Sequence, residues 1–117
     1  MRILVVDDDP SVAEVLAASV RADHHEALVA LDAAEALNIL ESVPIDGVVL
    51  DIVMPDMGGL AALSRIRSRH PMLPVVMLSG HADDELVREA LALGAIEVLR
   101  KPVALANLVN TLTRLRR

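Results

Sequence analysis

Two hydrophobic periods alternate along the chain. Short unbroken apolar runs are typical of strands buried on both faces of a parallel sheet, and stretches with apolar residues every three or four positions are typical of amphipathic helices. The expected strands are residues 3–6, 27–31, 48–51, 74–78 and 96–99. The expected helices cover residues 10–22, the stretch after Asp32, residues 59–69, residues 83–94 and a final helix that includes residues 105–115.

Polar residues mark several helix starts. Asp9-Pro10 combines an N-cap residue with a proline at the first helical position. Asp32 and Glu35 have the spacing of a capping box. The spacing of large apolar residues predicts that the first helix buries Val12, Val15, Leu16 and Val20.

The pattern predicts five β-α units, (βα)5, in one domain covering residues 1–117. The first, third and fourth strands are unbroken apolar runs and should be central, whereas the second is short and Glu97 interrupts the fifth. Right-handed crossovers then favour a doubly wound α/β fold, with a five-stranded parallel sheet of order 2-1-3-4-5 and helices on both faces.

Acidic residues follow two of the predicted central strands. Asp7, Asp8 and Asp9 come directly after the first strand, and Asp51 ends the third. Ligand sites in open α/β sheets form outside the carboxyl ends of neighbouring strands, so these carboxylates should converge. Two charges about 4 Å apart repel by roughly 4 kcal/mol at an effective dielectric near 20, which favours a bound cation. An all-oxygen cluster suits Mg²⁺; the alternative is that each aspartate merely caps a helix or begins a loop.

The residues at this predicted rim suit phosphoryl transfer, which needs positioning and charge neutralisation more than covalent help. Asp51 is the expected nucleophile, forming an acyl phosphate. Asp7, Asp8 and Asp51 itself would hold Mg²⁺. Lys101 would bind a phosphoryl oxygen and Ser79 would donate a hydrogen bond to another. Taken singly, Ser79 could be an ordinary strand-end cap and Lys101 a surface lysine.

Composition excludes several classes of function. The net charge of −6 argues against direct nucleic-acid binding, and no cysteine is present for disulfides or thiolate zinc sites. No apolar run is long enough to span a membrane and no signal peptide is visible, so we expect a cytoplasmic protein without membrane contact. Aromatic residues are absent, so no ring can stack on a base or flavin. His24, His25 and His70 lie at predicted loop edges without ligand spacing and should be exposed.

These motifs together resemble the receiver domain of two-component response regulators over essentially the full chain. The matching residues are Asp7-Asp8, Asp51 in Asp-x-x-Met-Pro, Gly59, Ser79, Gly94-Ala95 and Lys101-Pro102. The resemblance implies that Asp51 accepts a phosphoryl group from a histidine kinase or a histidine phosphotransfer domain. It further implies that the backbone carbonyl of Val53 completes the Mg²⁺ shell. It also implies that the fourth helix, fifth strand and fifth helix form a surface for an output domain or a homodimer.

The sequence departs from the family at two positions. Receivers usually carry Tyr or Phe where this chain has Val98, and commonly Phe where it has Val103. The leading hypothesis is a phosphorylated signalling switch that catalyses only its own phosphotransfer and dephosphorylation. The missing ring leaves open a pseudo-receiver, an interaction module with weak or no switching.

Two alternatives belong to other classes. A flavodoxin-like cofactor protein lacks its phosphate-binding loop here, and it would need an aromatic residue to flank the flavin. A Mg²⁺ phosphatase would need a separate acid-base aspartate to hydrolyse the acyl phosphate. Both therefore rank below the signalling switch.

Overall fold

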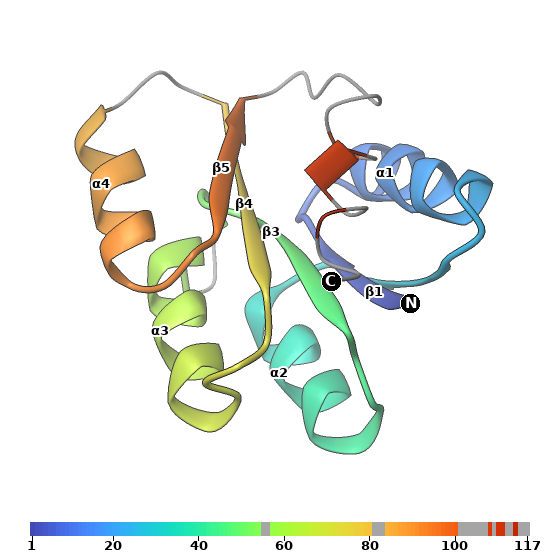
Figure 1. Cartoon of the computed structure of the whole chain (residues 1–117), viewed down its shortest axis with the longest axis horizontal. Coiled ribbons are helices and arrows are strands. Elements are labelled where there is room, and N and C mark those ends of the chain that lie inside the picture. The colour runs from blue at the N-terminus through green and yellow to red at the C-terminus, as the bar shows by residue number, and fades with distance from the viewer. Residues whose placement is uncertain (55–56, 81–83, 101–107, 109, 112–113, 115–117) are drawn as a thin grey trace.

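A computed structural model describes residues 1–54, 57–80, 84–100, 108, 110, 111 and 114. The strands are β1 (Arg2–Val6), β2 (Glu26–Ala30), β3 (Gly47–Asp51), β4 (Val75–Ser79) and β5 (Glu97–Arg100). The helices among the described residues are α1 (Pro10–Ala22), α2 (Ala33–Ser42), α3 (Gly59–Arg69) and α4 (Asp84–Ala92). All five strands pair in parallel in the order β2-β1-β3-β4-β5, which confirms the predicted sheet (Figure 1). Leu108, Asn110, Thr111 and Arg114 are also helical, and the rest of the predicted final helix lies outside the described residues.

The burial of each strand matches its place in the sheet. Every residue of β3 and β4 is buried, whereas no residue of the edge strand β5 is fully buried. Alternate residues of β1 and β3 contribute to two separate hydrophobic clusters. Leu4 and Leu50 pack with residues of α2 and α3, and Ile3 and Val49 pack with residues of α1. Side chains that alternate along each strand thus build two cores from one sheet.

The predicted start of α1 is correct, but its predicted buried face is partly wrong. Asp9 Oδ1 accepts hydrogen bonds from the backbone N–H groups of Ser11 and Val12, at 2.9 and 3.4 Å. Val15, expected in the core, is 58% exposed. The buried positions are Ala13, Leu16, Ala17 and Val20. These positions follow the helical spacing i, i+3, i+4 and i+7, so two alanines lie on the buried face in place of the larger Val12 and Val15 side chains expected there.

The predicted capping box at α2 is present in a shifted form. Asp32 Oδ1 accepts a hydrogen bond from the Glu35 N–H at 2.7 Å. The Glu35 carboxylate accepts in return from the N–H of Leu31, one residue before the cap, at 3.2 Å. Both ends of the turn are therefore held by side chains.

Arg67 joins three segments near the N-terminal ends of β4 and β5, where α3 and α4 end. Its Nη1 donates to the carbonyl oxygens of Pro71 and Leu73 at 2.9 and 2.8 Å, and its Nη2 donates to that of Gly94 at 2.9 Å. Gly94 has φ +105°, and a Cβ there would lie 2.7 Å from Arg67 Nε. Only glycine fits this turn without both backbone strain and displacement of the guanidinium.

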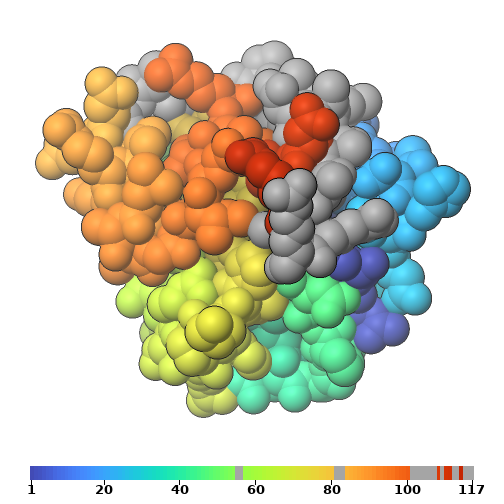
Figure 2. Space-filling view, in the orientation of Figure 1, coloured from blue at the N-terminus to red at the C-terminus, as the bar shows by residue number. Residues whose placement is uncertain are grey.

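The space-filling view shows the outer surface of this half of the molecule. The orange surface of α4 and β5 lies above the yellow-green surface of α3 (Figure 2). Leu91 of α4, and Leu93 and Ile96 between α4 and β5, are 46, 37 and 49% exposed. Among the described residues, no helix has both the length and the apolar character needed to cross a bilayer.

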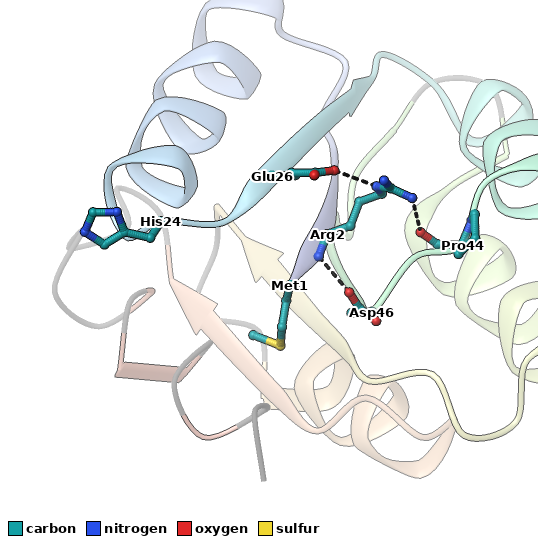
Figure 3. Close-up of a pocket in the computed structure, with 6 residues that line it drawn as sticks. All are labelled: Met1, Arg2, His24, Glu26, Pro44 and Asp46. Atoms are coloured by element: carbon teal, nitrogen blue, oxygen red, sulfur yellow. Dashed lines mark hydrogen bonds and ion pairs between the residues drawn. The ribbon is translucent and has the colours of Figure 1, made fainter.

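A polar network surrounds the N-terminal end of β1, opposite the end where Asp7 lies. Arg2 donates from Nε to Glu26 at 2.7 Å and from Nη1 to the Pro44 carbonyl at 3.2 Å, and its backbone N–H donates to Asp46 at 2.7 Å (Figure 3). These residues line a hollow of about 390 Å³. Because the polar groups of the hollow bind one another across β1, β2 and the segment before β3, the network aligns the start of the sheet.

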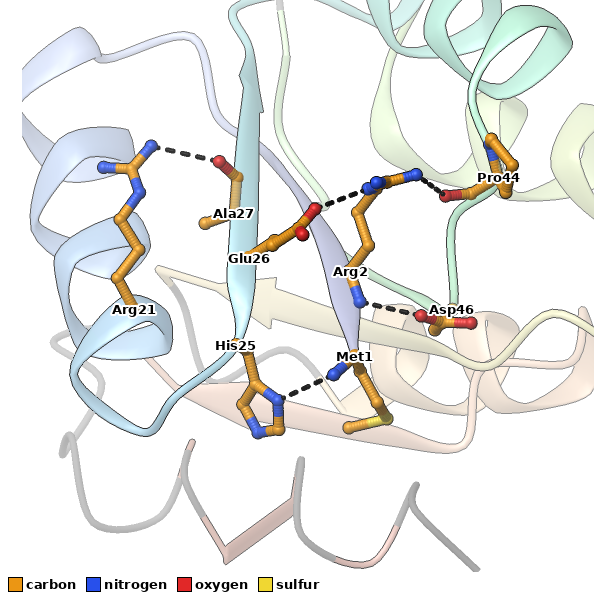
Figure 4. A network of polar contacts seen from close by, with 8 residues as sticks. All are labelled: Met1, Arg2, Arg21, His25, Glu26, Ala27, Pro44 and Asp46. Carbon is orange, nitrogen blue, oxygen red and sulfur yellow. Dashed lines mark hydrogen bonds and ion pairs between the residues drawn. The ribbon is translucent and has the colours of Figure 1, made fainter.

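The prediction that His25 is exposed is wrong. Its side chain is buried, and Nε2 lies 3.1 Å from a carboxylate oxygen of Asp23. Nδ1 lies 3.1 Å from the amino group of Met1, as Figure 4 shows. His24 is exposed, as expected. The backbone reverses at His24, which has φ +66°, and this turns the next side chain inward.

Candidate functional site

Three carboxylates meet at the C-terminal ends of β1 and β3. Val6 of β1 is in register with Leu50 of β3, so Asp7 and Asp51 each occupy the next position along adjacent strands. Oxygen atoms of Asp7, Asp8 and Asp51 all lie within 4.8 Å of one another. The sheet order that the hydrophobic pattern predicts therefore brings these three side chains together.

The acid cluster, defined as Asp7, Asp8 and Asp51, is buried on one side and open on the other. Asp7 is fully buried and Asp51 is 4% exposed, whereas Asp8 is exposed. Burial of two carboxylates is unfavourable unless hydrogen bonds or a cation compensate for lost hydration. The open side at Asp8 would allow an ion or a phosphoryl donor to reach the buried oxygens.

Backbone N–H groups orient one oxygen of each buried carboxylate. Asp7 Oδ1 accepts a hydrogen bond from the N–H of Asp9 at 3.0 Å. Asp51 Oδ1 accepts one from the N–H of Val53 at 3.2 Å. Both bonds span two residues, as in an Asx-turn, so the chain that leaves each strand also fixes the carboxylate at its end. The hydrophobic pattern does not predict these bonds, although an aspartate at the boundary between strand and loop is their usual signal.

Ser79 lies on the neighbouring strand at the same edge of the sheet. Leu78 of β4 is in register with Asp51, so Ser79 is one position beyond it, and its side chain is buried. Val53, whose carbonyl is a predicted metal ligand, follows Asp51 in the loop and its side chain is 60% exposed. Lys101, the remaining predicted site residue, lies outside the described residues, as does Pro102.

The start of α3 packs against the peptide that links Asp51 to Ile52. The N–H of Gly59 donates to the Ile52 carbonyl at 2.6 Å, and the Ile52 N–H donates to the Leu78 carbonyl at 2.9 Å. The residue after the central carboxylate is thus held between α3 and β4.

The donor set fits a small hard cation. Magnesium prefers oxygen ligands about 2.0–2.1 Å away in octahedral geometry, so two ligands on opposite sides are about 4.2 Å apart. The oxygens of the acid cluster lie within 4.8 Å of one another, close to that value, so the three carboxylates would together hold such an ion with bound water completing its shell. Carboxylates suit Mg²⁺ rather than softer metals, which prefer sulfur or imidazole ligands.

Comparison with known proteins identifies the family to which the chain belongs. Residues 3–113 match the family model of the response regulator receiver domain. A putative response regulator, NtrX-like, from Rickettsia conorii is 36% identical over 114 residues, which is 96% of this chain and 24% of the relative. The DNA-binding transcriptional regulator NtrC of Escherichia coli K12 is 39% identical over 100 residues, 86% of this chain and 21% of the relative. The chain thus spans about a quarter of the length of the curated relatives it matches.

Solved structures share the fold over nearly the whole chain. The receiver domain of NtrX from Brucella abortus is 37% identical with a TM-score of 0.89, covering 97% of this chain and 96% of that one. A CheY-like receiver domain protein from Methanospirillum hungatei is 28% identical with a TM-score of 0.92, covering 97 and 90%. The resemblance inferred from the motifs is confirmed, and the chain belongs to the response regulator receiver domain family.

Proposed function

We propose that the protein is a phosphoacceptor switch in which Asp51 receives a phosphoryl group from a phosphohistidine. The observation that carries this proposal is the acid cluster itself, with two buried carboxylates and one exposed carboxylate within 4.8 Å at adjacent strand ends. Family membership supports a histidine kinase or a histidine phosphotransfer domain as the donor. The expected activity is limited to the domain's own phosphotransfer and dephosphorylation.

The proposed reaction exchanges one phosphorus bond for another. A carboxylate oxygen of Asp51 attacks the phosphorus atom, an O–P bond forms, the N–P bond of the phosphohistidine breaks, and the imidazole leaves with the electron pair. Asp7, Asp8, Asp51 and the Val53 carbonyl would hold Mg²⁺, which supplies charge neutralisation for the phosphoryl oxygens. Asp51 Oδ1 is oriented by the Val53 N–H, which leaves the carboxylate in a defined direction for attack.

Two further residues would bind the transferred group. Ser79, buried at the end of β4, would donate its hydroxyl proton to a phosphoryl oxygen. Lys101 directly follows β5, the strand next to β4, and its ammonium group would bind another phosphoryl oxygen. Both roles remain predictions that mutation would test.

The output surface that we propose lies on α4, β5 and the predicted fifth helix, which would complete the (βα)5 fold. Its support is the exposure of an apolar group of three residues that lie close in sequence, Leu91 of α4 and Leu93 and Ile96 between α4 and β5. An output domain or a second copy would cover this group. Cytoplasmic location and the absence of direct nucleic-acid binding remain predictions.

A pseudo-receiver is the second candidate, and Val98 favours it. Val98 lies in β5 in register with Met77 and packs against the α2–α3 side of the core, where receivers usually carry a ring. Without the ring, movement at Ser79 would be transmitted to β5 only weakly. This candidate keeps the fold and the interactions but not the switching.

Phosphorylation with acetyl phosphate and Mg²⁺ tests the proposal. Intact mass spectrometry should show a gain of one phosphoryl group in the wild type and none in Asp51→Asn, while Asp46→Asn, an exposed aspartate at the other end of β3, should behave as wild type. An unmodified wild-type mass together with no Mg²⁺ binding would refute the phosphoacceptor role. Amide shifts on adding beryllofluoride then separate the candidates, because a switch changes signals in α4 and β5 and a pseudo-receiver changes only those near the acid cluster.

A further inference from the structure

We propose that Gly59 is a positioning residue for the acid cluster, because its missing side chain allows α3 to pack directly against the backbone of Asp51. This inference rests on the proposed function, since it assigns to Gly59 the task of keeping the phosphoacceptor in place for metal and phosphoryl binding. The contact joins the backbone of Gly59 to the backbone of Asp51 and Ile52, and it involves no side chain of the acid cluster.

The contact is unusually close. A Cβ atom on Gly59 would lie 2.2 Å from the backbone oxygen of Asp51, 2.5 Å from Ile52 Cα and 2.6 Å from the Ile52 carbonyl oxygen. All three are backbone atoms, so no flexible side chain can move aside. The Gly59 N–H donates to the same Ile52 carbonyl at 2.6 Å, which holds the two segments together.

Space, rather than backbone conformation, requires glycine at this position. Gly59 is the first residue of α3 and is not among the residues with a left-handed φ. An alanine at a position whose backbone conformation suits it normally stabilises a protein by about 0.4–1 kcal/mol. Here the sign should reverse, because the added carbon would overlap the 51–52 peptide.

The overlap is large enough to affect the site. Real Cβ atoms essentially never approach other heavy atoms below 3.0 Å, so a contact of 2.2 Å must open by at least about 0.8 Å. Binding constellations need their groups held within about 0.5 Å. Movement of the 51–52 peptide would displace the Asp51 carboxylate and its bond to the Val53 N–H, while Asp7 and Asp8, which follow β1, stay in place. The oxygens would then no longer form one compact ligand set.

The test compares Gly59→Ala with Ala61→Gly. Ala61 is exposed on the same helix, so Ala61→Gly should lower stability by about 1 kcal/mol through helix propensity alone without approaching Asp51. Isothermal titration with Mg²⁺ should show a dissociation constant raised at least about tenfold in Gly59→Ala, the usual cost of disturbing a group that orients a metal ligand. Ala61→Gly should bind as wild type. The initial rate of phosphorylation by acetyl phosphate should be lower in Gly59→Ala than in wild type and unchanged in Ala61→Gly.

The possible outcomes separate this inference from the proposed function. If the wild type fails to bind Mg²⁺, the proposed function fails first. If the wild type binds and Gly59→Ala binds equally well, only the positioning role is overturned. Both variants should be titrated in sucrose, which favours the folded state, with the folded fraction followed by circular dichroism. If Gly59→Ala stays unfolded there, the residue serves stability alone and the positioning role is again overturned.

Discussion

Replacing Asp8 by asparagine should stabilise the protein without Mg²⁺ and weaken its response to Mg²⁺. Asp8 is the exposed member of the acid cluster, so the substitution removes one negative charge without burying a new polar group. The backbone hydrogen bonds of Asp7 and Asp51 come from Asp9 and Val53 and should survive the change. The expected effect is therefore electrostatic.

The separation of the carboxylates gives the size of the effect. Two unit charges 4.8 Å apart repel by about 3.5 kcal/mol at an effective dielectric of 20 and by about 0.9 kcal/mol in bulk water. Because Asp8 is exposed, we expect a repulsion toward the lower limit from each of Asp7 and Asp51, so removal of its charge should raise the free energy of unfolding by about 1–2 kcal/mol. Mg²⁺ at one hundred times its dissociation constant should stabilise the wild type by about 2.7 kcal/mol, and Asp8→Asn by clearly less.

Urea unfolding followed by circular dichroism is the suitable assay, because the chain has no aromatic residue for fluorescence. Each protein is unfolded in EDTA and in Mg²⁺ at matched ionic strength. Asp9→Asn is the matched control, since it loses the same charge outside the acid cluster and asparagine is an equally good N-cap. It should gain less stability in EDTA and keep the full response to Mg²⁺. The reasoning would be refuted if Asp8→Asn were no more stable than wild type in EDTA, or if Mg²⁺ stabilised both equally.

Three further predictions concern the fold and use the same urea measurement. Arg67→Met removes the donors to the Pro71, Leu73 and Gly94 carbonyls and should lower the free energy of unfolding by about 2–4 kcal/mol. The control Arg65→Met, on the exposed side of α3, should change this free energy by less than about 0.5 kcal/mol. Asp9→Ala removes the cap of α1 and should cost about 1 kcal/mol, so an unchanged midpoint would contradict the capping role. Leu16→Ala should cost about 2–5 kcal/mol and Val15→Ala less than about 0.5 kcal/mol, and equal costs would contradict the observed face of α1.

The sheet could be predicted from the sequence because its order depends on a few strong signals. Unbroken apolar runs distinguish the central strands, Glu97 marks an edge strand, and parallel connections have one hand. The convergence of Asp7 and Asp51 follows from that order alone, since residues after adjacent parallel strands share one edge. The acid cluster could therefore be predicted because the strand order could be predicted.

Details that depend on side-chain packing were less predictable. Val15 is apolar but faces solvent, because the angular position of a residue on a helix decides its burial and alanines can fill the buried positions. His25 is buried because the backbone reverses at His24, and no periodicity predicts that reversal. The close packing at Gly59 could not be derived from composition or spacing, since it depends on how near α3 approaches β3.

The geometry of the acid cluster is fixed mainly by the backbone, and this determines which substitutions should damage it. The pairing of Val6 with Leu50 sets the distance between the strands, and the chain after each strand orients its own carboxylate. Conservative changes in either hydrophobic core would preserve these features as long as the strand register holds, because shape-compatible apolar residues substitute for one another at modest cost. Substitutions that move the end of β3, above all at Gly59, should disturb the site even though they alter no ligand. We therefore expect the effect of a substitution on the site to depend more on the distance of the substituted residue from the 51–52 peptide than on the burial of that residue.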